Sequence, residues 1–298
     1  MGMTLLDIER LKAAVAPEVA PFEPIWGCYI VSMRTLQFFL GQKWVTSNIL
    51  DAKNPQDYLR TGGITDWDNR LFLTRIIILA ELFLNLQRIP NFPGVVARIR
   101  EDRRARCLED VIAELTFAKL LILDQIPFQF ISAGESKAPD IEIMVDGLRV
   151  FCEVKCKRET TAVGVETLKN SLTNIRHQLP EREFGMVAFG LPNIWMSKPE
   201  NLVLLDEAAA WAFRKTERLA LLIFFSEELI VLEDGMPVAT LYREYRSPRA
   251  PMAERLPRTL LSPVGLTRRP PHWISVLDLL PEEIAAMAGE DRHFNGGG

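Results

Sequence analysis

Two carboxylates and a lysine form the clearest chemical pattern in the sequence. Pro139 and Asp140 are followed, after twelve residues, by Glu153, Val154 and Lys155. Side chains two positions apart on a β-strand project from one face, so Glu153 and Lys155 are expected side by side. Two converging carboxylates are costly to bring together unless a divalent cation neutralises them. The pattern therefore predicts a metal site suited to phosphoester hydrolysis.

A β-hairpin is predicted to bring these groups together. Strands are expected over 141–145 and 148–156, with Asp146-Gly147 as the turn that makes them antiparallel. Asp140 precedes the first strand, so the pairing places its carboxylate near Glu153. Glu142 could replace Asp140 as a ligand if the register differed. The alternative is an edge strand on which Glu153 and Lys155 form a solvated charge pair.

The motif resembles that of the PD-(D/E)xK nuclease superfamily, which has the restriction-endonuclease-like fold. The resemblance covers about residues 95–192, a third of the chain. It implies that Asp140 and Glu153 bind Mg²⁺ or Mn²⁺, with the carbonyl of Val154 as a further candidate ligand. It also implies that Lys155 orients or helps to deprotonate the attacking water.

Members of that superfamily carry an acidic residue on the helix before the first core strand. The sequence offers Glu109 and Glu114, which stand about 140° apart around a helix. Glu114 has apolar neighbours at helical spacing, so we expect it to face the core and to hold the metal shell or a bridging water. Glu109 is expected to face solvent or nearby arginines. The alternative is that Glu114 pairs with a basic side chain and is purely structural.

Several basic and polar residues are candidates for contact with the substrate. Arginines are frequent in residues 98–106 and again in residues 243–269, and either run could grip phosphates, although a solvated surface is the alternative. Lys157 lies on the Glu153 face of its predicted strand, and Gln178 lies near the end of the next predicted helix. The candidate substrate-binding residues are Arg103, Arg104, Lys157 and Gln178.

The wider pattern predicts an α/β protein with a mixed central sheet flanked by helices and a helical N-terminal region. Three parts are expected: a mostly helical region 1–94, a nuclease-like α/β core 95–245, and a Pro/Arg-rich segment with a short helix, 246–298. Helices are predicted at 66–88, 95–124, 164–179 and 278–288. Strands are predicted at 127–131, 141–145, 148–156, 186–191 and 219–225, with a hairpin at 229–242 and irregular structure at 243–271.

Composition excludes several classes of protein. The chain has 298 residues, 48% hydrophobic and 25% charged, with a net charge of −4, which argues against fibrous, disordered and bulk nucleic-acid-coating proteins. Charged residues interrupt the longest apolar stretch, 71–86, so no membrane span is expected. The first ten residues do not resemble a secretory signal, and four cysteines suggest reduced thiols in a cytoplasmic protein.

Other catalytic motifs find no support in the sequence. It contains neither a phosphate-binding Gly-Lys-Ser/Thr loop nor a dinucleotide fingerprint. The three histidines form no triad or metal spacing. Cys152 and Cys156 share the apolar face of a predicted strand and are expected to be buried thiols.

The function predicted from these observations is metal-dependent hydrolysis of phosphodiester bonds in nucleic acid, with DNA as the expected substrate. Mg²⁺ or Mn²⁺ is the expected cofactor. One alternative is a catalytically inactive nuclease-like module that binds nucleic acid or a protein partner. Another is an interaction protein that forms a homodimer through the N-terminal helical region, with the apolar helix 66–88 as the dimer surface.

Overall fold

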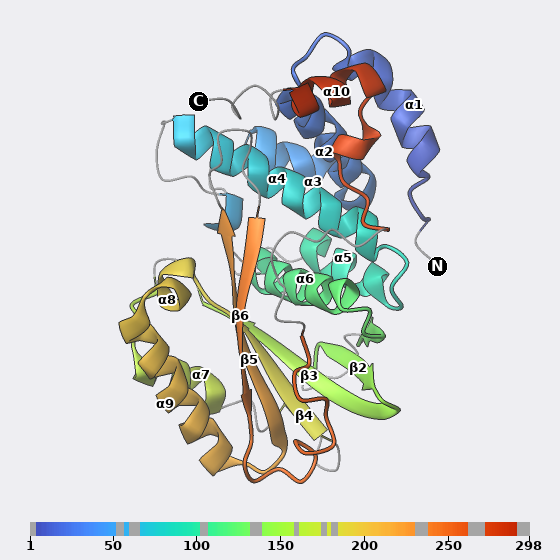
Figure 1. The fold of residues 1–298 in the computed structure, drawn as a ribbon. Coiled ribbons are helices and arrows are strands. Elements are labelled where there is room, and N and C mark those ends of the chain that lie inside the picture. Colours follow the sequence, from blue (N-terminus) through green and yellow to red (C-terminus); the bar gives the residue numbers. More distant parts are fainter. Residues whose placement is uncertain are drawn as a thin grey trace.

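A mixed β-sheet with helices on both faces forms one end of the molecule, and a bundle of N-terminal helices forms the other (Figure 1). This arrangement confirms the predicted α/β class with its helical N-terminal region. The computed structural model describes residues 4–51, 57–59, 66–101, 107–131, 139–157, 161–173, 178–179, 184–229, 238–261 and 272–290.

The described strands form one six-stranded sheet in chain order. The pairs β1/β2, β2/β3 and β5/β6 are antiparallel, whereas β3/β4 and β4/β5 are parallel. β3 is therefore an interior strand, flanked by β2 and β4. The bounds are β1 Phe128–Phe130, β2 Ile141–Val145, β3 Leu148–Cys156, β4 Phe184–Gly190, β5 Leu219–Leu229 and β6 Val238–Arg246.

The β2–β3 hairpin is as the sequence predicts. Its register pairs Ile141 with Cys152 and Val145 with Leu148. Asp146 and Gly147 form the turn with φ angles of 49° and 77°, the left-handed conformation that a two-residue hairpin turn requires at both positions. The turn thereby fixes which residues of the two strands lie opposite each other.

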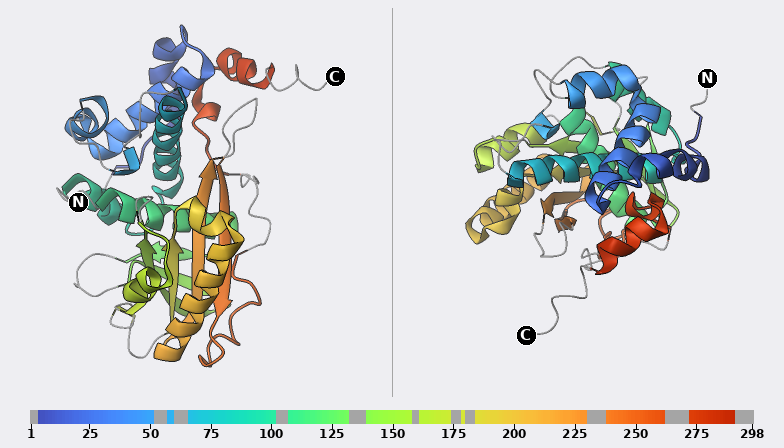
Figure 2. Two further views of the ribbon diagram at one scale, coloured as in Figure 1. Left: turned by 90° about the vertical axis from the view of Figure 1, so that its left-hand side faces the viewer. Right: turned by 90° about the horizontal axis from the view of Figure 1, so that it is seen from above.

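Different helices cover the two faces of the sheet (Figures 1 and 2). α6 (Cys107–Leu123) packs on the face that carries Val150, Cys152 and Val154 of β3. The opposite face packs Val187 and Phe189 of β4 against α7 (Val165–Thr173), α8 (Asn193–Ser197) and α9 (Pro199–Lys215). Glu153 and Lys155 alternate with the α6-facing residues and so point toward this second face.

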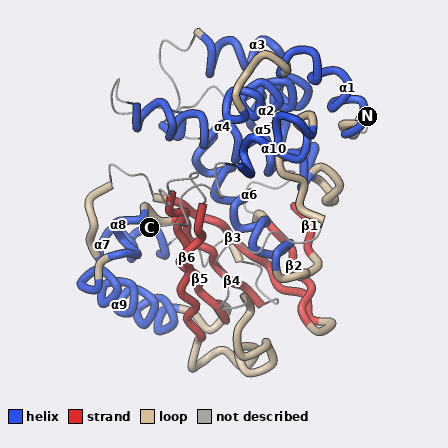
Figure 3. Tube along the Cα trace, turned by 45° about the horizontal axis from the view of Figure 1, so that its top comes forward, coloured by secondary structure: helices blue, strands red, loops and turns tan. Residues whose placement is uncertain are grey.

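α6 runs between the N-terminal helices and the sheet, as Figure 3 also shows, and contacts both. Aromatic side chains continue the core across this boundary: the ring centroids of Phe83 and Phe92 are 5.5 Å apart, and those of Phe92 and Phe130 are 6.2 Å apart. The division expected at residue 94 stays a prediction. The N-terminal elements are α1 Ile8–Val19, α2 Pro24–Leu40, α3 Gln42–Val45, η1 Thr46–Leu50, η2 Asp57–Leu59, α4 Asp66–Leu86 and α5 Phe92–Glu101.

α4 is the apolar helix that the sequence predicts at 66–88, and most of its apolar side chains are buried against the chain's own helices. Polar residues of α4 form hydrogen bonds with the C-terminal segment at residues 274–276. Glu81 accepts hydrogen bonds from Ser275 Oγ (2.7 Å) and the Val276 N–H (3.0 Å), and Asn85 accepts from the Ile274 N–H (2.8 Å). A homodimer stays a prediction. Among the described residues, no helix is both long and apolar enough to cross a membrane.

Four predicted elements differ from the structure. The helix expected at 95–124 is described as α5 and α6, with residues 102–106 outside the described part. The helix expected at 164–179 ends, as described, at Thr173, and Gln178 lies in a turn. The strand at 219–225 continues to Leu229 and pairs antiparallel with β6, Leu229 opposite Val238; the turn of the hairpin expected at 229–242 lies in residues 230–237, outside the described residues. The C-terminal helix is split into a 3-10 turn, η4 Leu277–Leu279, and α10 Glu282–Glu290.

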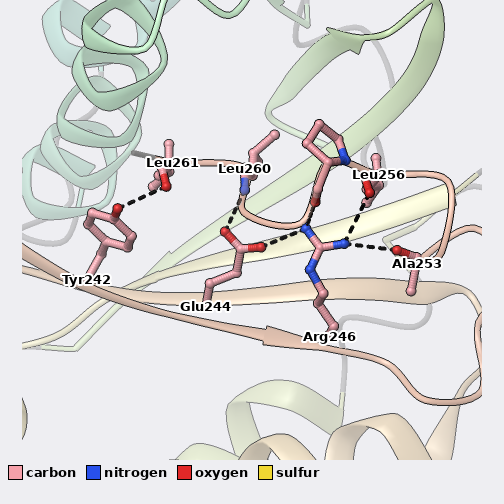
Figure 4. Close-up of polar contacts among 8 residues, drawn as sticks. Tyr242, Glu244, Arg246, Ala253, Leu256, Leu260 and Leu261 are labelled. Carbon is pink, nitrogen blue, oxygen red and sulfur yellow. Dashed lines mark hydrogen bonds and ion pairs between the residues drawn. The ribbon is translucent and has the colours of Figure 1, made fainter. Parts of the chain in front are cut away.

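The segment expected to be irregular begins only after β6, at residue 247, and it is fixed to that strand (Figure 4). Arg246 donates to the carbonyl oxygens of Ala253 (2.9 Å) and Pro257, and it pairs with Glu244 at 2.9 Å. Glu244 in turn accepts the Leu260 N–H at 2.8 Å. The segment therefore covers the part of the α6-facing side of the sheet that lies over β5 and β6.

Candidate functional site

Asp140 is held against the backbone on both sides of Glu153. Its N–H donates to the carbonyl of Cys152 (3.0 Å), and its Oδ2 accepts the N–H of Val154 (2.8 Å). The hairpin thus brings together the two carboxylates that the sequence separates by twelve residues. The expected ligand role of the Val154 carbonyl stays a prediction.

Glu153 is buried, with 3% of its side chain exposed, and it forms an ion pair with Lys155 through Oε1. Its Oε2 is buried and has no hydrogen-bond partner among the residues that the structure describes. Lys155 is 31% exposed, so its ammonium group lies at the boundary between Glu153 and solvent. The alternative of a solvated pair on an edge strand is wrong, because β3 is an interior strand and Glu153 is buried.

Glu114 is buried in α6, as its apolar neighbours predict, and it is paired with Arg98 of α5. Arg98 Nη1 donates to Oε1 at 2.9 Å and Nη2 to Oε2, so both carboxylate oxygens are used. The alternative that Glu114 pairs with a basic side chain is therefore what the structure shows. Its role as a metal ligand stays a prediction.

The carboxylates of Asp140, Glu114 and Glu153 and the cationic groups of Lys155 and Arg98 form a charged cluster. Its members change one another's pKa. Burial and the nearby Asp140 carboxylate raise the pKa of Glu114 to about 8, although Arg98 opposes the rise. Burial and Asp140 also raise the pKa of Glu153 to about 7, against the effect of Lys155. Burial raises the pKa of Asp140, while the Val154 N–H and Lys155 lower it. The carboxylates of Asp140, Glu153 and Glu114 with the cations of Lys155 and Arg98 sum to one formal negative charge. The Asp110 carboxylate, which also raises the pKa of Asp140 and of Lys155, brings the sum to two.

Burial would lower the pKa of Lys155, but the Glu153 carboxylate outweighs burial and the pKa is raised. Lys155 therefore remains an ammonium group in this state. A group of this charge can orient a water molecule and offset negative charge that develops on a phosphate.

Glu109 is half-buried on α6; the arginines at 103–106 that it was expected to face, as the alternative to solvent, lie outside the described residues, so that expectation stays a prediction. Glu109 Oε1 accepts the N–H of Tyr58 at 2.6 Å, so it links α6 to the turn η2. Asp110, the next residue, accepts a hydrogen bond from Cys156 Sγ at 3.1 Å. Cys156 is half-buried and Cys152 is fully buried.

The structure places two of the four candidate substrate contacts. The Lys157 N–H donates to the Gly190 carbonyl at 2.9 Å just beyond β3, and burial lowers the pKa of its side chain. Gln178 is half-buried in its turn. Arg103 and Arg104 lie outside the described residues. Glu142 pairs with Phe151, which is the expected register. Glu142 was a candidate to replace Asp140 as a metal ligand only in a different register, so this condition is not met.

Three arginines of the second basic run, residues 243–269, make internal contacts. Arg246 holds the segment after β6, Arg243 pairs with Asp206 (3.0 Å), and Arg249 pairs with Glu217 (2.8 Å). These three arginines therefore have structural partners, and the expected role of the run in gripping phosphates gains no support from them.

The residues at the cluster fit a divalent cation in part. The buried Oε2 of Glu153 is the kind of oxygen that a cation would satisfy, and Asp140 supplies a second hard oxygen donor. In the part of the chain that the structure describes, no three His, Cys, Asp or Glu side chains are gathered as a metal centre. A cation here would therefore rely on two carboxylates, backbone carbonyls and water, a ligand set typical of Mg²⁺.

Nothing in the sequence identifies Arg98 as a partner of Glu114. It lies in the basic run that begins there, but it is sixteen residues from Glu114 and on another helix. Neither the distance of Arg98 from Pro93-Gly94 in the sequence nor its place among the other arginines predicts a contact with Glu114.

Comparisons of the chain with models of protein families, with curated proteins and with solved structures find no match.

Proposed function

We propose that the chain is a divalent-metal-dependent phosphodiesterase that acts on nucleic acid, with DNA as the expected substrate. The observation that carries the proposal is the Oε2 of Glu153 beside Asp140, which is buried and has no partner in the described part of the chain. Leaving a buried acceptor without a partner costs about 1–3 kcal/mol, so a ligand for this atom is expected. The element order α6, β1, β2, β3, α7, β4 is also the one implied by the PD-(D/E)xK resemblance.

In this proposal Asp140 and Glu153 hold Mg²⁺ or Mn²⁺. The cation, when bound, would supply positive charge to the phosphate and a more acidic water. The Asp140 carboxylate is held in position by the hydrogen bond that its Oδ2 accepts from the Val154 N–H. Lys155 orients the attacking water and offsets charge on the phosphate, because its ammonium group lies next to Glu153 and is partly exposed.

One observation favours the second candidate, a nuclease-like module that binds without cleaving. Glu153 and Glu114 already have cationic partners in Lys155 and Arg98, so much of their charge is neutralised within the chain. A module of this kind would bind nucleic acid or a protein partner and would need no metal.

The test is incubation of the purified protein with supercoiled plasmid and with linear DNA in the presence of Mg²⁺. Lys155→Ala should lose cleavage, whereas Lys198→Ala, an exposed lysine just before α9, should retain it. DNA binding without Mg²⁺-dependent cleavage in the wild type would favour the inactive module.

A further inference from the structure

The described helices cover only part of the sheet face opposite α6. There α7, α8 and α9 pack against β4 and β5. Leu179 marks the boundary, because it lies over Gly185 of β4: a side-chain carbon at that glycine would be 2.5 Å from Leu179 Cδ1. Beyond Gly185 the register continues to Phe151 of β3 and Glu142 of β2. The covered layer therefore ends beside Phe151.

Five side chains of β1, β2 and β3 form an accessible patch on this face, called here the open patch. They alternate with core residues that face α6, and none of the five is buried. Met144 is 41% exposed, Arg149 is exposed, and the other three are half-buried. A ligand can therefore reach this part of the sheet from solvent. The open patch consists of Gln129, Glu142, Met144, Arg149 and Phe151.

The open patch is continuous with the proposed metal site. Phe151 lies two residues before Glu153 on β3, and both side chains project from the same face. On β2, Glu142 pairs with Phe151, and Asp140 lies two residues before Glu142. Two residues of a strand span about 7 Å, which is twice the rise of roughly 3.4 Å per nucleotide in one strand of a duplex. A nucleic acid whose phosphate lies at the metal site would therefore have a base within one or two nucleotides of Phe151.

The open patch offers a planar, delocalised surface. The guanidinium carbon of Arg149 lies 5.1 Å from the centroid of the Phe151 ring, which is a cation–π contact. Met144 pairs with Arg149 across the hairpin and adds an exposed, polarisable thioether. Bases that are not stacked within a duplex stack on aromatic rings and on guanidinium planes. A guanidinium group donates its hydrogen bonds within its plane, so other partners of Arg149 are compatible with stacking.

Charge favours a single strand over a duplex at the open patch. Glu142 accepts a hydrogen bond from Gln129 Nε2 at 3.3 Å and offsets the charge of Arg149, and the hairpin turn adds the exposed Asp146. The patch thus has no excess of positive charge for the phosphates on which the binding of duplex DNA depends. Stacking needs no such excess and accepts any base, because every base has a π face.

We propose that Phe151, Arg149 and Met144 form a stacking platform for an unpaired base of single-stranded nucleic acid. The base belongs to a nucleotide beside the phosphate at the proposed metal site. This inference rests on the proposed function and narrows its substrate class to nucleic acid with a single-stranded stretch.

The test measures binding of a labelled single-stranded DNA of about 15 thymidines, with Ca²⁺ in place of Mg²⁺ to limit turnover. Wild type should bind this strand at least about tenfold more tightly than the duplex of the same length. Phe151→Leu keeps an apolar side chain but removes the π face, so it should weaken binding of the single strand about tenfold. Phe151→Tyr keeps the π face and should bind as wild type does.

A second variant and a matched control complete the comparison. Arg149→Lys is an exposed substitution that keeps the charge and removes the guanidinium plane, so it should weaken binding about threefold. The control is Trp211→Leu on α9, outside the open patch. Trp211 is a half-buried aromatic residue whose ring centroid lies 5.6 Å from the ammonium group of Lys215, so the variant removes a cation–π pair of the same kind. It should bind the single strand as wild type does.

Two measurements separate the platform from the metal site. The Mn²⁺ affinity of Phe151→Leu, measured by calorimetry, should stay within about threefold of wild type. With a chelator in place of Ca²⁺, Phe151→Leu should still bind the single strand more weakly than wild type, because stacking needs no metal.

Three results would overturn the inference. The first is that Phe151→Leu and Arg149→Lys bind the single strand as tightly as Trp211→Leu. The second is equal affinity of wild type for the single strand and the duplex. The third is a dimer of wild type that Phe151→Leu dissociates with no change in DNA binding, since the open patch would then dock a second copy of the chain. A wild type that neither binds Mn²⁺ nor cleaves DNA would instead overturn the proposed function, and the experiment with the chelator would still test the platform.

Discussion

Asp140 Oδ2 accepts the backbone N–H of Val154 at 2.8 Å, which fixes the aspartate carboxylate beside the strand that carries Glu153 and Lys155. A side chain held by a backbone donor keeps its place when neighbouring side chains rearrange. The contact ties the turn geometry of the β2–β3 hairpin to the position of a proposed metal ligand.

Replacing Asp140 or Glu153 with Ala should abolish cleavage and leave the fold intact, because a clustered like charge is removed and little core packing is lost. Asp140→Asn is a gentler variant, since its amide oxygen can still accept the Val154 N–H. DNA cleavage and the thermal unfolding midpoint should be measured together. Retained cleavage in both Ala variants would exclude the mechanism.

Glu114→Gln and Glu109→Gln test the phase of α6. The first should reduce turnover about tenfold or more, because it removes a buried negative charge that interacts with Asp140 and Glu153. The second should be near neutral, because a glutamine oxygen can still accept the Tyr58 N–H. Mg²⁺-dependent cleavage rates of both variants decide the matter. An effect at Glu109 with none at Glu114 would mean that the wrong helix face has been assigned to the site.

Stability without metal should fall as pH rises from about 4.5 to 7, the ordinary and the raised pKa of Glu153. Within this range the folded state binds more protons than the unfolded state, so raising the pH favours unfolding. Glu153→Gln removes this group. Between pH 5 and pH 8 the variant should lose less unfolding free energy than wild type, by on the order of 2 kcal/mol.

Urea unfolding with a chelator at the two pH values measures the effect. Glu200→Gln, an exposed acid in the first turn of α9, is the control and should follow wild type. Equal losses in Glu153→Gln and wild type would show that Glu153 is not the titrating group. Mg²⁺ at pH 8 should stabilise wild type more than the variant.

Arg246→Met should lower the free energy of unfolding by about 2–4 kcal/mol, because Glu244 and several carbonyl groups lose their partner. Arg249→Met should change it by less than about 0.5 kcal/mol, because that arginine and Glu217 are both exposed. Urea denaturation compares the two. Similar small losses would show that the segment after β6 does not depend on Arg246.

The β2–β3 hairpin and the burial of Glu114 could be predicted from sequence because their causes are local. Alternating apolar residues and an Asp-Gly turn define the hairpin, and helical spacing defines the buried face of α6. The extension of β5 to Leu229 could not be seen, because charged residues end its apolar run. In the fold Glu227 is matched by Lys119 of α6 at 2.9 Å.

The pairing of Arg98 with Glu114 is a tertiary contact between two helices, and residue spacing carries no information about it. The same holds for Arg246, whose partners lie on a segment that sequence describes only as irregular. The sequence could thus indicate which residues are acidic and on which face they lie. It could not indicate which cations neutralise them.

Calorimetric titration of Mn²⁺ tests the central claim most directly. Wild type should bind about one ion saturably, and Asp140→Asn and Glu153→Gln should each weaken this binding at least tenfold. Glu142→Gln, on the same hairpin, where the Glu142 carboxylate accepts a hydrogen bond from Gln129 Nε2 at 3.3 Å, should bind as wild type does. Absence of saturable binding in wild type, or equal binding in all four proteins, would contradict a metal site at Asp140 and Glu153.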